Sequence, residues 1–164
     1  MGISPMPSSR KARDAILRLM AETGTGPVYE LGSGWGGLAI LLAKKHPERK
    51  IVGYEVSLVP WLVSVLFKKL FGLSNLEIHR KNFLLADLSG AEVLVCFLYT
   101  GGMREIAEKL MAEEVSNVFL ISNYFALPSC QPDMSLRIND FYQSPIYRYR
   151  LRGAFRTGVK MHIA

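Results

Sequence analysis

The sequence VYELGSGWGG (residues 28–37) places a glycine-rich turn between an apolar strand and an apolar helix, and it decides how the chain is interpreted. Gly32, Gly34 and Gly37 match the G-x-G-x-x-G spacing of a dinucleotide-binding turn. In that interpretation Glu55, which lies 18 residues after Gly37, would bind the ribose. A second interpretation starts from the acidic residue two positions before the first glycine.

That acidic residue is Glu30, and its charge separates the two interpretations. A dinucleotide presents a pyrophosphate to the turn, and like charges about 4 Å apart repel by roughly 4 kcal/mol at an effective dielectric constant of about 20. S-adenosylmethionine (SAM) instead presents an ammonium and a sulfonium group, which a carboxylate attracts. The turn would then use Gly32, Gly34 and Gly36, which permit positive φ angles and close approach of the ligand. The sequence therefore favours SAM over NAD.

Glu55 fits the same ligand. It ends the segment IVGYE (residues 51–55), a predicted strand, and a carboxylate can accept hydrogen bonds from both hydroxyls of a ribose. The order strand, acidic residue, glycine turn, helix, strand and second acidic residue is more specific than the glycine spacing alone.

The rest of the chain alternates between strand and helix patterns. Apolar or alternating segments predict strands at residues 28–32, 50–56, 75–81, 91–99 and 115–125. Helical patterns occupy residues 8–22, 36–46, 58–73 and 101–114. Strands separated by helices predict a mostly parallel α/β sheet with right-handed crossovers.

The pattern changes after Pro128. Two alternating segments flank residues 143–145 and predict a β-hairpin, hence at least one antiparallel strand. One face of its second strand would carry Tyr147, Tyr149 and Leu151, and the other Arg148, Arg150 and Arg152. We expect the second face to present three guanidinium groups to solvent.

The chain has 164 residues, which predicts a single domain. We divide it into an N-terminal helix region (1–26), an α/β core (27–127) and a C-terminal hairpin region (128–164). No apolar run approaches the roughly 20 residues that a membrane span needs, and no signal peptide is evident, so we expect a cytoplasmic protein. The three histidines and two cysteines form no metal-binding spacing, so no metal is expected.

The formal net charge is +6, and from residue 131 onward six basic residues stand against two acidic ones. A basic face of this kind can attract nucleic acid, acidic lipid or an acidic protein. Charge alone does not choose among these partners.

The segments YELGSGWGG and VGYE resemble the first two motifs of class I SAM-dependent methyltransferases. That resemblance implies a Rossmann-like, seven-stranded sheet in the order 3-2-1-4-5-7-6, with strand 7 antiparallel. It also implies an adenine contact after the third strand, where the sequence offers Asn82 and Phe83. The implied cofactor-binding residues are Glu30, Gly32, Ser33, Gly34, Trp35, Gly36, Glu55, Asn82 and Phe83.

A narrower resemblance is to the small protein-lysine methyltransferases related to those acting on the ATP synthase c-subunit and the adenine nucleotide translocase. It is carried by PMPSS (residues 5–9), ELGSGWGGLAILLAKK (30–45) and VGYEVSLVPWLV (52–63). Trp35 and Gly37 stand where that family tends to have Asp and Arg. The resemblance implies methyl transfer to a protein lysine, with membrane-associated proteins among the acceptors and a peripheral position at a membrane as one location.

The acceptor should meet the ends of the fourth and fifth strands, because ligands of open α/β sheets lie over the carboxyl ends. Tyr99 and Tyr124 could form an aromatic wall for an alkylammonium group, and Asn123 could orient it. No Asn/Asp-Pro-Pro-Tyr sequence follows the fourth strand, which argues against adenine or glutamine as acceptor. Two alternatives stay open: an RNA methyltransferase, favoured by the pI of about 9.4, and a non-catalytic SAM-fold module, favoured by Trp35.

Overall fold

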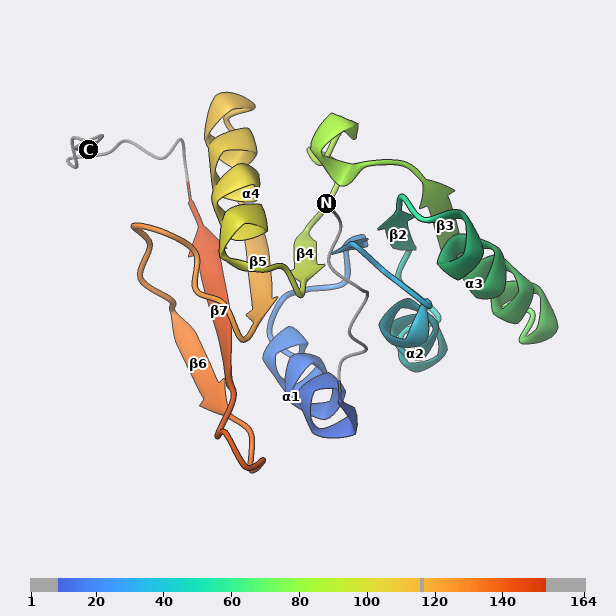
Figure 1. Ribbon diagram of the computed structural model, residues 1–164, viewed down its shortest axis with the longest axis horizontal. Helices are drawn as coiled ribbons and strands as arrows, with labels where there is room; N and C mark the ends of the chain where they lie inside the picture. Colours follow the sequence, from blue (N-terminus) through green and yellow to red (C-terminus); the bar gives the residue numbers. More distant parts are fainter. Residues whose placement is uncertain (1–8, 116, 153–164) are drawn as a thin grey trace.

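Seven strands form one sheet in the computed structural model, which describes residues 9–115 and 117–152 (Figure 1). The order across the sheet is β3-β2-β1-β4-β5-β7-β6. The strands are β1 Val28–Leu31, β2 Ile51–Glu55, β3 Leu76–Arg80, β4 Val93–Cys96, β5 Val118–Asn123, β6 Met134–Arg137 and β7 Pro145–Leu151. This order confirms the one that the resemblance implied.

The first five strands are parallel, and β7 is antiparallel to both β5 and β6. The carboxyl ends of β1 to β5 therefore meet at one edge, which we call the carboxyl edge. The β6–β7 connection lies at the same edge, because Ile146 near the start of β7 pairs with Asn123 at the end of β5. The predicted mixed sheet with a C-terminal antiparallel hairpin is confirmed.

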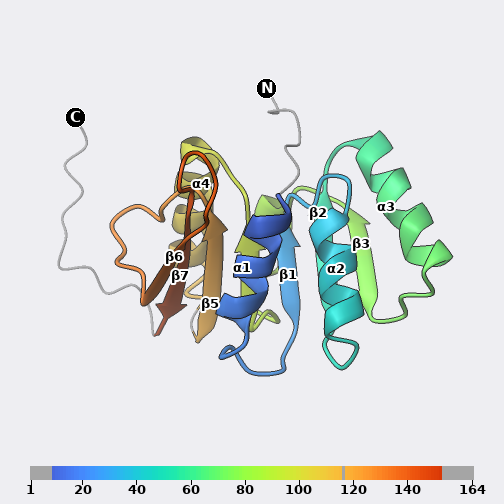
Figure 2. The ribbon, with the colours of Figure 1, turned by 90° about the horizontal axis from the view of Figure 1, so that it is seen from below.

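Helices cover both faces of the sheet (Figure 2). They are α1 Arg10–Met20, α2 Gly37–Lys45, α3 Leu58–Leu70 and α4 Thr100–Ala112, with a short 3-10 turn η1 at Phe83–Leu85. Side chains of α1 and α2 pack on one face, and those of α4 on the other. Every residue of β2 and β4 is buried, as expected for central strands of a doubly covered parallel sheet.

Helix α1 begins where its serine cap predicts. The backbone N–H of Ala12 donates to Ser9 Oγ at 3.1 Å, which satisfies one donor of the first turn. Ile16 and Leu19 then lie buried against the sheet. No helix within residues 9–115 and 117–152 is long and apolar enough to cross a membrane.

The fourth strand is shorter than the apolar run that predicted it. β4 ends at Cys96, and α4 already begins at Thr100. Tyr99 caps this helix, and its carbonyl accepts from the backbone N–H of Met103 at 2.9 Å. The backbone groups near Tyr99 are therefore used by a helix start, which places Tyr99 in the β4–α4 connection.

The hairpin connection also differs from the tight turn expected at residues 143–145. It runs from Ile138 to Ser144, between β6 and β7. Asp140 closes it, because its carboxylate accepts from the backbone N–H of Ser144 at 2.8 Å and from the Ser144 hydroxyl at 2.7 Å. An Asp side chain can replace backbone hydrogen bonds in such a loop, which lengthens the turn.

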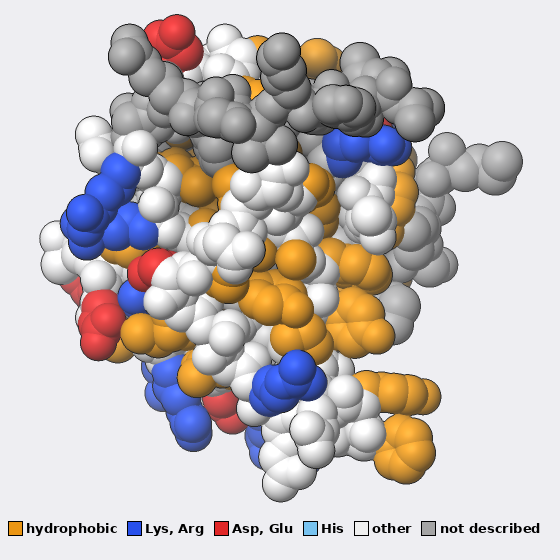
Figure 3. All heavy atoms as spheres, turned by 90° about the vertical axis from the view of Figure 1, so that its left-hand side faces the viewer, with side chains coloured by type: hydrophobic (Ala, Val, Ile, Leu, Met, Phe, Trp, Pro, Cys, Tyr) orange, Lys and Arg blue, Asp and Glu red, His pale blue; other side chains and the backbone are white. Residues whose placement is uncertain are grey.

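The prediction of three solvent-facing arginines on β7 is wrong for Arg148. Its side chain is buried; Nη2 donates to Asp133 Oδ2 at 2.8 Å and Nη1 to the carbonyl of Leu19 at 3.1 Å. The predicted alternation of tyrosines and arginines along β7 is correct. However, β7 lies between β5 and β6, and α1 covers the face of the sheet that carries Arg148. Arg150 and Arg152 are exposed. In Figure 3, the basic side chains on the side of β6 and β7 lie in separate groups.

Some sequence features lie outside the described residues. They are the start of the PMPSS segment, residues 5–8, and the basic residues Arg156 and Lys160. In the described ranges, no group of three or more His, Cys, Asp or Glu side chains is placed to hold a metal ion.

Candidate functional site

The glycine turn between β1 and α2 has the backbone conformation that its composition predicts. Gly32, Gly34 and Gly36 have φ angles of 78°, 53° and 75°. A side chain at Gly36 would also collide with Ser64, whose Oγ lies 2.6 Å from the position of an added Cβ. At Gly32 an added Cβ would meet only Leu98, at 3.8 Å. The turn is therefore packed tightly against α3 at one end and open at the other.

The turn is held against the neighbouring strand β2. The backbone N–H of Ser33 donates to the carbonyl of Tyr54 at 2.8 Å. Gly53 makes this approach possible, since a Cβ there would lie 3.1 Å from Ser33 Oγ. Gly53 was not among the predicted site residues, although it lies two residues before Glu55 in the sequence.

Glu55 organises the turn from the end of β2. Its Oε2 accepts from the backbone N–H of Gly34 at 2.8 Å, and its Oε1 from the N–H of Ser57 at 2.7 Å. Each carboxylate oxygen can accept more than one hydrogen bond, so a ribose contact stays compatible with these bonds. Glu55 thus links the glycine turn to the start of α3.

Ser64 is a second contact of the turn, and it was not among the residues predicted from the sequence. It is fully buried in α3, and its one hydroxyl hydrogen is shared between the carbonyl of Pro60 at 2.8 Å and that of Gly34 at 3.2 Å. A lone serine in the apolar run of residues 58–67 was the available signal, because a buried hydroxyl requires a partner.

Glu30 lies beneath the turn, at the end of β1. Burial raises the pKa of its carboxyl from 4.5 to about 8; a backbone hydrogen bond from Ala39 opposes this rise and the nearby Glu55 adds to it. Burial thus favours the neutral form of Glu30 when no cation is bound, whereas its charge in the sequence suggested a permanent anion. The difference arises because burial removes water from the charge.

Two buried polar atoms at the turn have no hydrogen-bond partner within the described part of the chain. They are Glu30 Oε2 and the Ser33 hydroxyl. Buried polar atoms without a partner are rare in native proteins and require an explanation. A ligand with cationic and hydrogen-bonding groups at this turn would supply it, so the residues present fit SAM.

Asn82 and Phe83 lie after β3, at the carboxyl edge. Asn82 Oδ1 accepts from the backbone N–H of Leu84 at 3.0 Å and so caps η1. Phe83 packs against the buried cluster on the α4 face. The cap uses one lone pair of the amide oxygen, so its second lone pair and the NH2 group both stay available for an adenine contact.

Tyr99 follows β4, Asn123 is the last residue of the adjacent strand β5, and Tyr124 follows it; the two strands pair through Cys96 and Ser122. Tyr99 and Tyr124 are about half exposed and Asn123 is buried. Tyr124 has a φ of 74°, an unusual value for an aromatic residue, and its N–H donates to the carbonyl of Pro145 at 2.8 Å. The topology thus brings all three to the same edge as the glycine turn.

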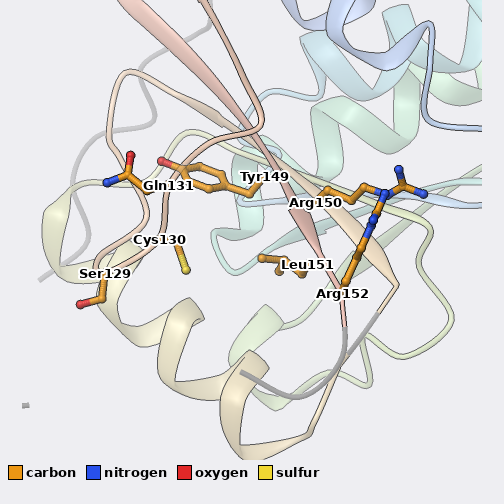
Figure 4. Close-up of a pocket in the computed structure, with 7 residues that line it drawn as sticks. All are labelled: Ser129, Cys130, Gln131, Tyr149, Arg150, Leu151 and Arg152. Atoms are coloured by element: carbon orange, nitrogen blue, oxygen red, sulfur yellow. The ribbon is translucent and has the colours of Figure 1, made fainter. Parts of the chain in front are cut away.

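A separate hollow of about 280 Å³ lies against β7 (Figure 4). It is lined by Ser129, Cys130, Gln131, Tyr149, Arg150, Leu151 and Arg152. Leu151 pairs with Val118 at the start of β5. The hollow is therefore at the edge opposite the glycine turn and takes no part in the candidate site.

Solved structures share this architecture. An RNA methyltransferase from Salinibacter ruber with bound S-adenosyl-L-homocysteine aligns with a TM-score of 0.80 and 20% identity, over 97% of this chain and 99% of that one. PKMT2 from Rickettsia typhi in complex with AdoHcy aligns with a TM-score of 0.51 and 21% identity, over 63% of this chain and 22% of that one. The fold is that of the class I methyltransferases.

Sequence comparison identifies the family. Residues 30–134 match the family described as ANTKMT methyltransferase domain, and the chain belongs to that family. A protein-lysine N-methyltransferase of Saccharolobus islandicus (strain REY15A) is 25% identical over 138 residues, 82% of this chain and 84% of the relative. The adenine nucleotide translocase lysine N-methyltransferase of Mus musculus is 32% identical over 110 residues, 65% of this chain and 47% of its own length.

These matches decide between the enzyme and the non-catalytic module. The chain is a SAM-dependent methyltransferase, and SAM is its methyl donor. The interpretation that the glycine turn suggested is confirmed, and the dinucleotide alternative is set aside.

Proposed function

We propose that this enzyme transfers a methyl group from SAM to the side-chain amine of a protein lysine. The observation that carries the proposal is the family match over residues 30–134. Two relatives in different organisms bear names that state lysine N-methylation. The acceptor class follows from these relatives, and the geometry of the site is compatible with it.

We propose that the cofactor is held at the glycine turn. Glu30 and Ser33 would meet the polar end of SAM, because each carries a buried atom without a partner in the described chain. Glu55 would accept from the ribose hydroxyls while it holds the turn through Gly34. Asn82 and Phe83 would flank the adenine, and Trp35, Gly32, Gly34 and Gly36 would form the rim of the pocket.

SAM supplies an activated methyl group whose leaving thioether departs neutral, so the enzyme's own contribution is mainly positioning. A lysine amine must first lose a proton, since with a pKa of about 10.4 it is neutral in about one part in a thousand at physiological pH. A nearby sulfonium opposes a second positive charge and thus favours the neutral amine. No dedicated base is required for this step.

We assign the acceptor contacts to Tyr99, Asn123 and Tyr124. The half-exposed aromatic rings of Tyr99 and Tyr124 can attract an alkylammonium group and exclude water from it. The backbone of Tyr124 is held in its unusual conformation by the bond to Pro145, which keeps the ring at the carboxyl edge. Asn123 would orient the amine by hydrogen bonding.

An RNA acceptor is the second candidate. The net charge of +6 favours it, as does the likeness in fold to a protein described as an RNA methyltransferase. The burial of Arg148 weakens it, because the basic face on β7 is reduced to Arg150 and Arg152.

The acceptor is tested by labelling a lysate with the purified enzyme and SAM carrying an isotopic methyl group. Label on lysine, located by digestion and mass spectrometry, supports the proposal. Label that survives protease and is lost to nuclease assigns the enzyme to RNA instead. The same lysate without the added enzyme serves as the control for label transferred by other enzymes.

A further inference from the structure

Helix α3 exposes an apolar surface to solvent. Seven large apolar residues of α3 and its flanks are exposed on its outer side, together with Val56 before it. This surface, the α3 face, consists of Val56, Leu58, Val59, Leu62, Leu66, Phe67, Leu70 and Phe71. In both Figure 1 and Figure 2, α3 is the outermost element at its end of the molecule and no other element lies outside it.

Helix α3 is apolar on both sides. Its inner side carries the buried Pro60 and Ser64 and the partly buried Trp61 and Val65, which pack against the core, while its leucines and phenylalanines are exposed on the outer side. Ser64 is needed on the inside because it bonds Gly34 and leaves no space for a larger residue. An apolar stripe of this length on the solvent side of a monomer marks an interaction surface.

The charged residues within α3 are both lysines. Residues 56–76 contain no Asp or Glu. Lys68 and Lys69 lie in the last turn of α3, and Lys44 of α2 has its Nζ 3.2 Å from the ring centroid of Phe71. The first acidic residue beyond the helix, Glu77, is already paired with Lys50 at 2.9 Å. An occupant of this face should therefore be apolar at its centre and negatively charged around it.

We propose that the α3 face docks on the surface of an anionic lipid membrane. A helix with Leu and Phe on one side and lysines beside them can lie in the interface, its apolar side buried about 5–10 Å deep. α3 has 13 residues and is too short to span a bilayer, which takes about 20. A second copy of the chain offers no acidic residue on this face to pair with the lysines.

Docking through α3 would place the active site beside the membrane. α3 starts directly after Glu55, at the carboxyl edge, and Ser57 at its cap bonds that carboxylate. Residues that are exposed at the start of α3 are therefore close to the cofactor turn. An acceptor held at the membrane surface would meet the enzyme without free diffusion of both partners. This inference does not depend on whether the acceptor is a protein or RNA.

The test is flotation of the purified full chain with vesicles of phosphatidylcholine, with or without phosphatidylserine. The wild type should float with the phosphatidylserine vesicles and much less with phosphatidylcholine alone. Leu62→Gln with Leu66→Gln should lower the partition by about tenfold or more, because both side chains lie on the exposed side. Lys68→Gln with Lys69→Gln should lower it by about fivefold per lysine removed.

The matched control is Phe141→Gln with Tyr142→Gln, an exposed aromatic pair in the β6–β7 connection, across the sheet from α3. This control should float like the wild type, and all variants should keep the wild-type affinity for S-adenosylhomocysteine, which shows that they fold. The proposal is overturned if the wild type does not float with the phosphatidylserine vesicles. It is also overturned if the Leu62/Leu66 variant and the Phe141/Tyr142 control lose vesicle binding equally. A wild-type dimer that the Leu62/Leu66 variant turns into a monomer overturns it as well, since a second copy would then cover the face.

Discussion

The carboxylate of Glu55 holds the backbone of Gly34: Oε2 accepts from its N–H at 2.8 Å. The bond joins the end of β2 to the turn that follows β1, and Oε1 joins the same side chain to Ser57 at 2.7 Å. Glu55 therefore has a structural task in addition to the ribose contact that we propose. Removal of its carboxylate should loosen the turn and weaken cofactor binding together.

Glu55→Ala should weaken SAM binding by about 1–3 kcal/mol, the range for hydrogen bonds to a charged group. Calorimetric titration with SAM measures this loss. Thermal unfolding of the ligand-free variant should show a lowered midpoint as well, because Gly34 and Ser57 lose their acceptor. An unchanged SAM affinity would remove Glu55 from the ribose site.

Glu30 should make the ligand-free protein less stable as the pH rises. Its pKa is about 8 in the fold and 4.5 as the ordinary value, so the folded state binds the extra proton between these two values. Its contribution to stability is complete below 4.5 and is lost as the pH rises toward 8. Glu30→Gln should flatten this part of the dependence, measured by urea unfolding at a series of pH values.

The same titration predicts how SAM binding responds to pH. A cationic ligand favours the ionised carboxylate, so SAM binding should release a proton from Glu30 and strengthen as the pH rises toward about 8. Calorimetry in buffers of different ionisation enthalpy counts the released protons. If Glu30→Gln releases as many protons as the wild type, the released proton does not come from Glu30.

Trp35 should report on ligand binding. It stands in the glycine turn with its side chain 45% exposed, so it is not part of the core. Its fluorescence should change when SAM binds, measured in a Trp61→Phe background. Trp61 needs to be replaced because it is half-buried in α3 and donates to the carbonyl of Ile78 at 3.0 Å. A spectrum that is unaffected by saturating SAM would place Trp35 away from the ligand.

The arginines at and just after β7 should differ in how much they contribute to the free energy of unfolding. Arg148→Ala should lower the free energy of unfolding by about 2–3 kcal/mol, because Asp133 and the carbonyl of Leu19 lose a charged donor. Arg150→Ser with Arg152→Ser should leave stability nearly unchanged, since both side chains are exposed. Urea unfolding of the three proteins compares them directly. Equal destabilisation by both changes would contradict the structure.

Local sequence patterns were sufficient for the order of the elements along the chain and for the glycine turn between β1 and α2. Glycine permits the positive φ angles of residues 32, 34 and 36 without strain, and the apolar runs of β2 and β4 are typical of a sheet covered on both sides. These features depend on a few neighbouring residues. They are readable before any tertiary contact is known.

The protonation of Glu30, the place of Arg148 and the outward face of α3 were decided only by the tertiary structure. Each depends on which other element covers the residue: α2 and β2 around Glu30, α1 over Arg148, and none outside Leu62 and Leu66 in the described chain. The sequence shows that a strand face or a helix face alternates, because that follows from backbone geometry. Which face is covered depends on packing between segments far apart in the chain, and burial then sets the charge and the contacts.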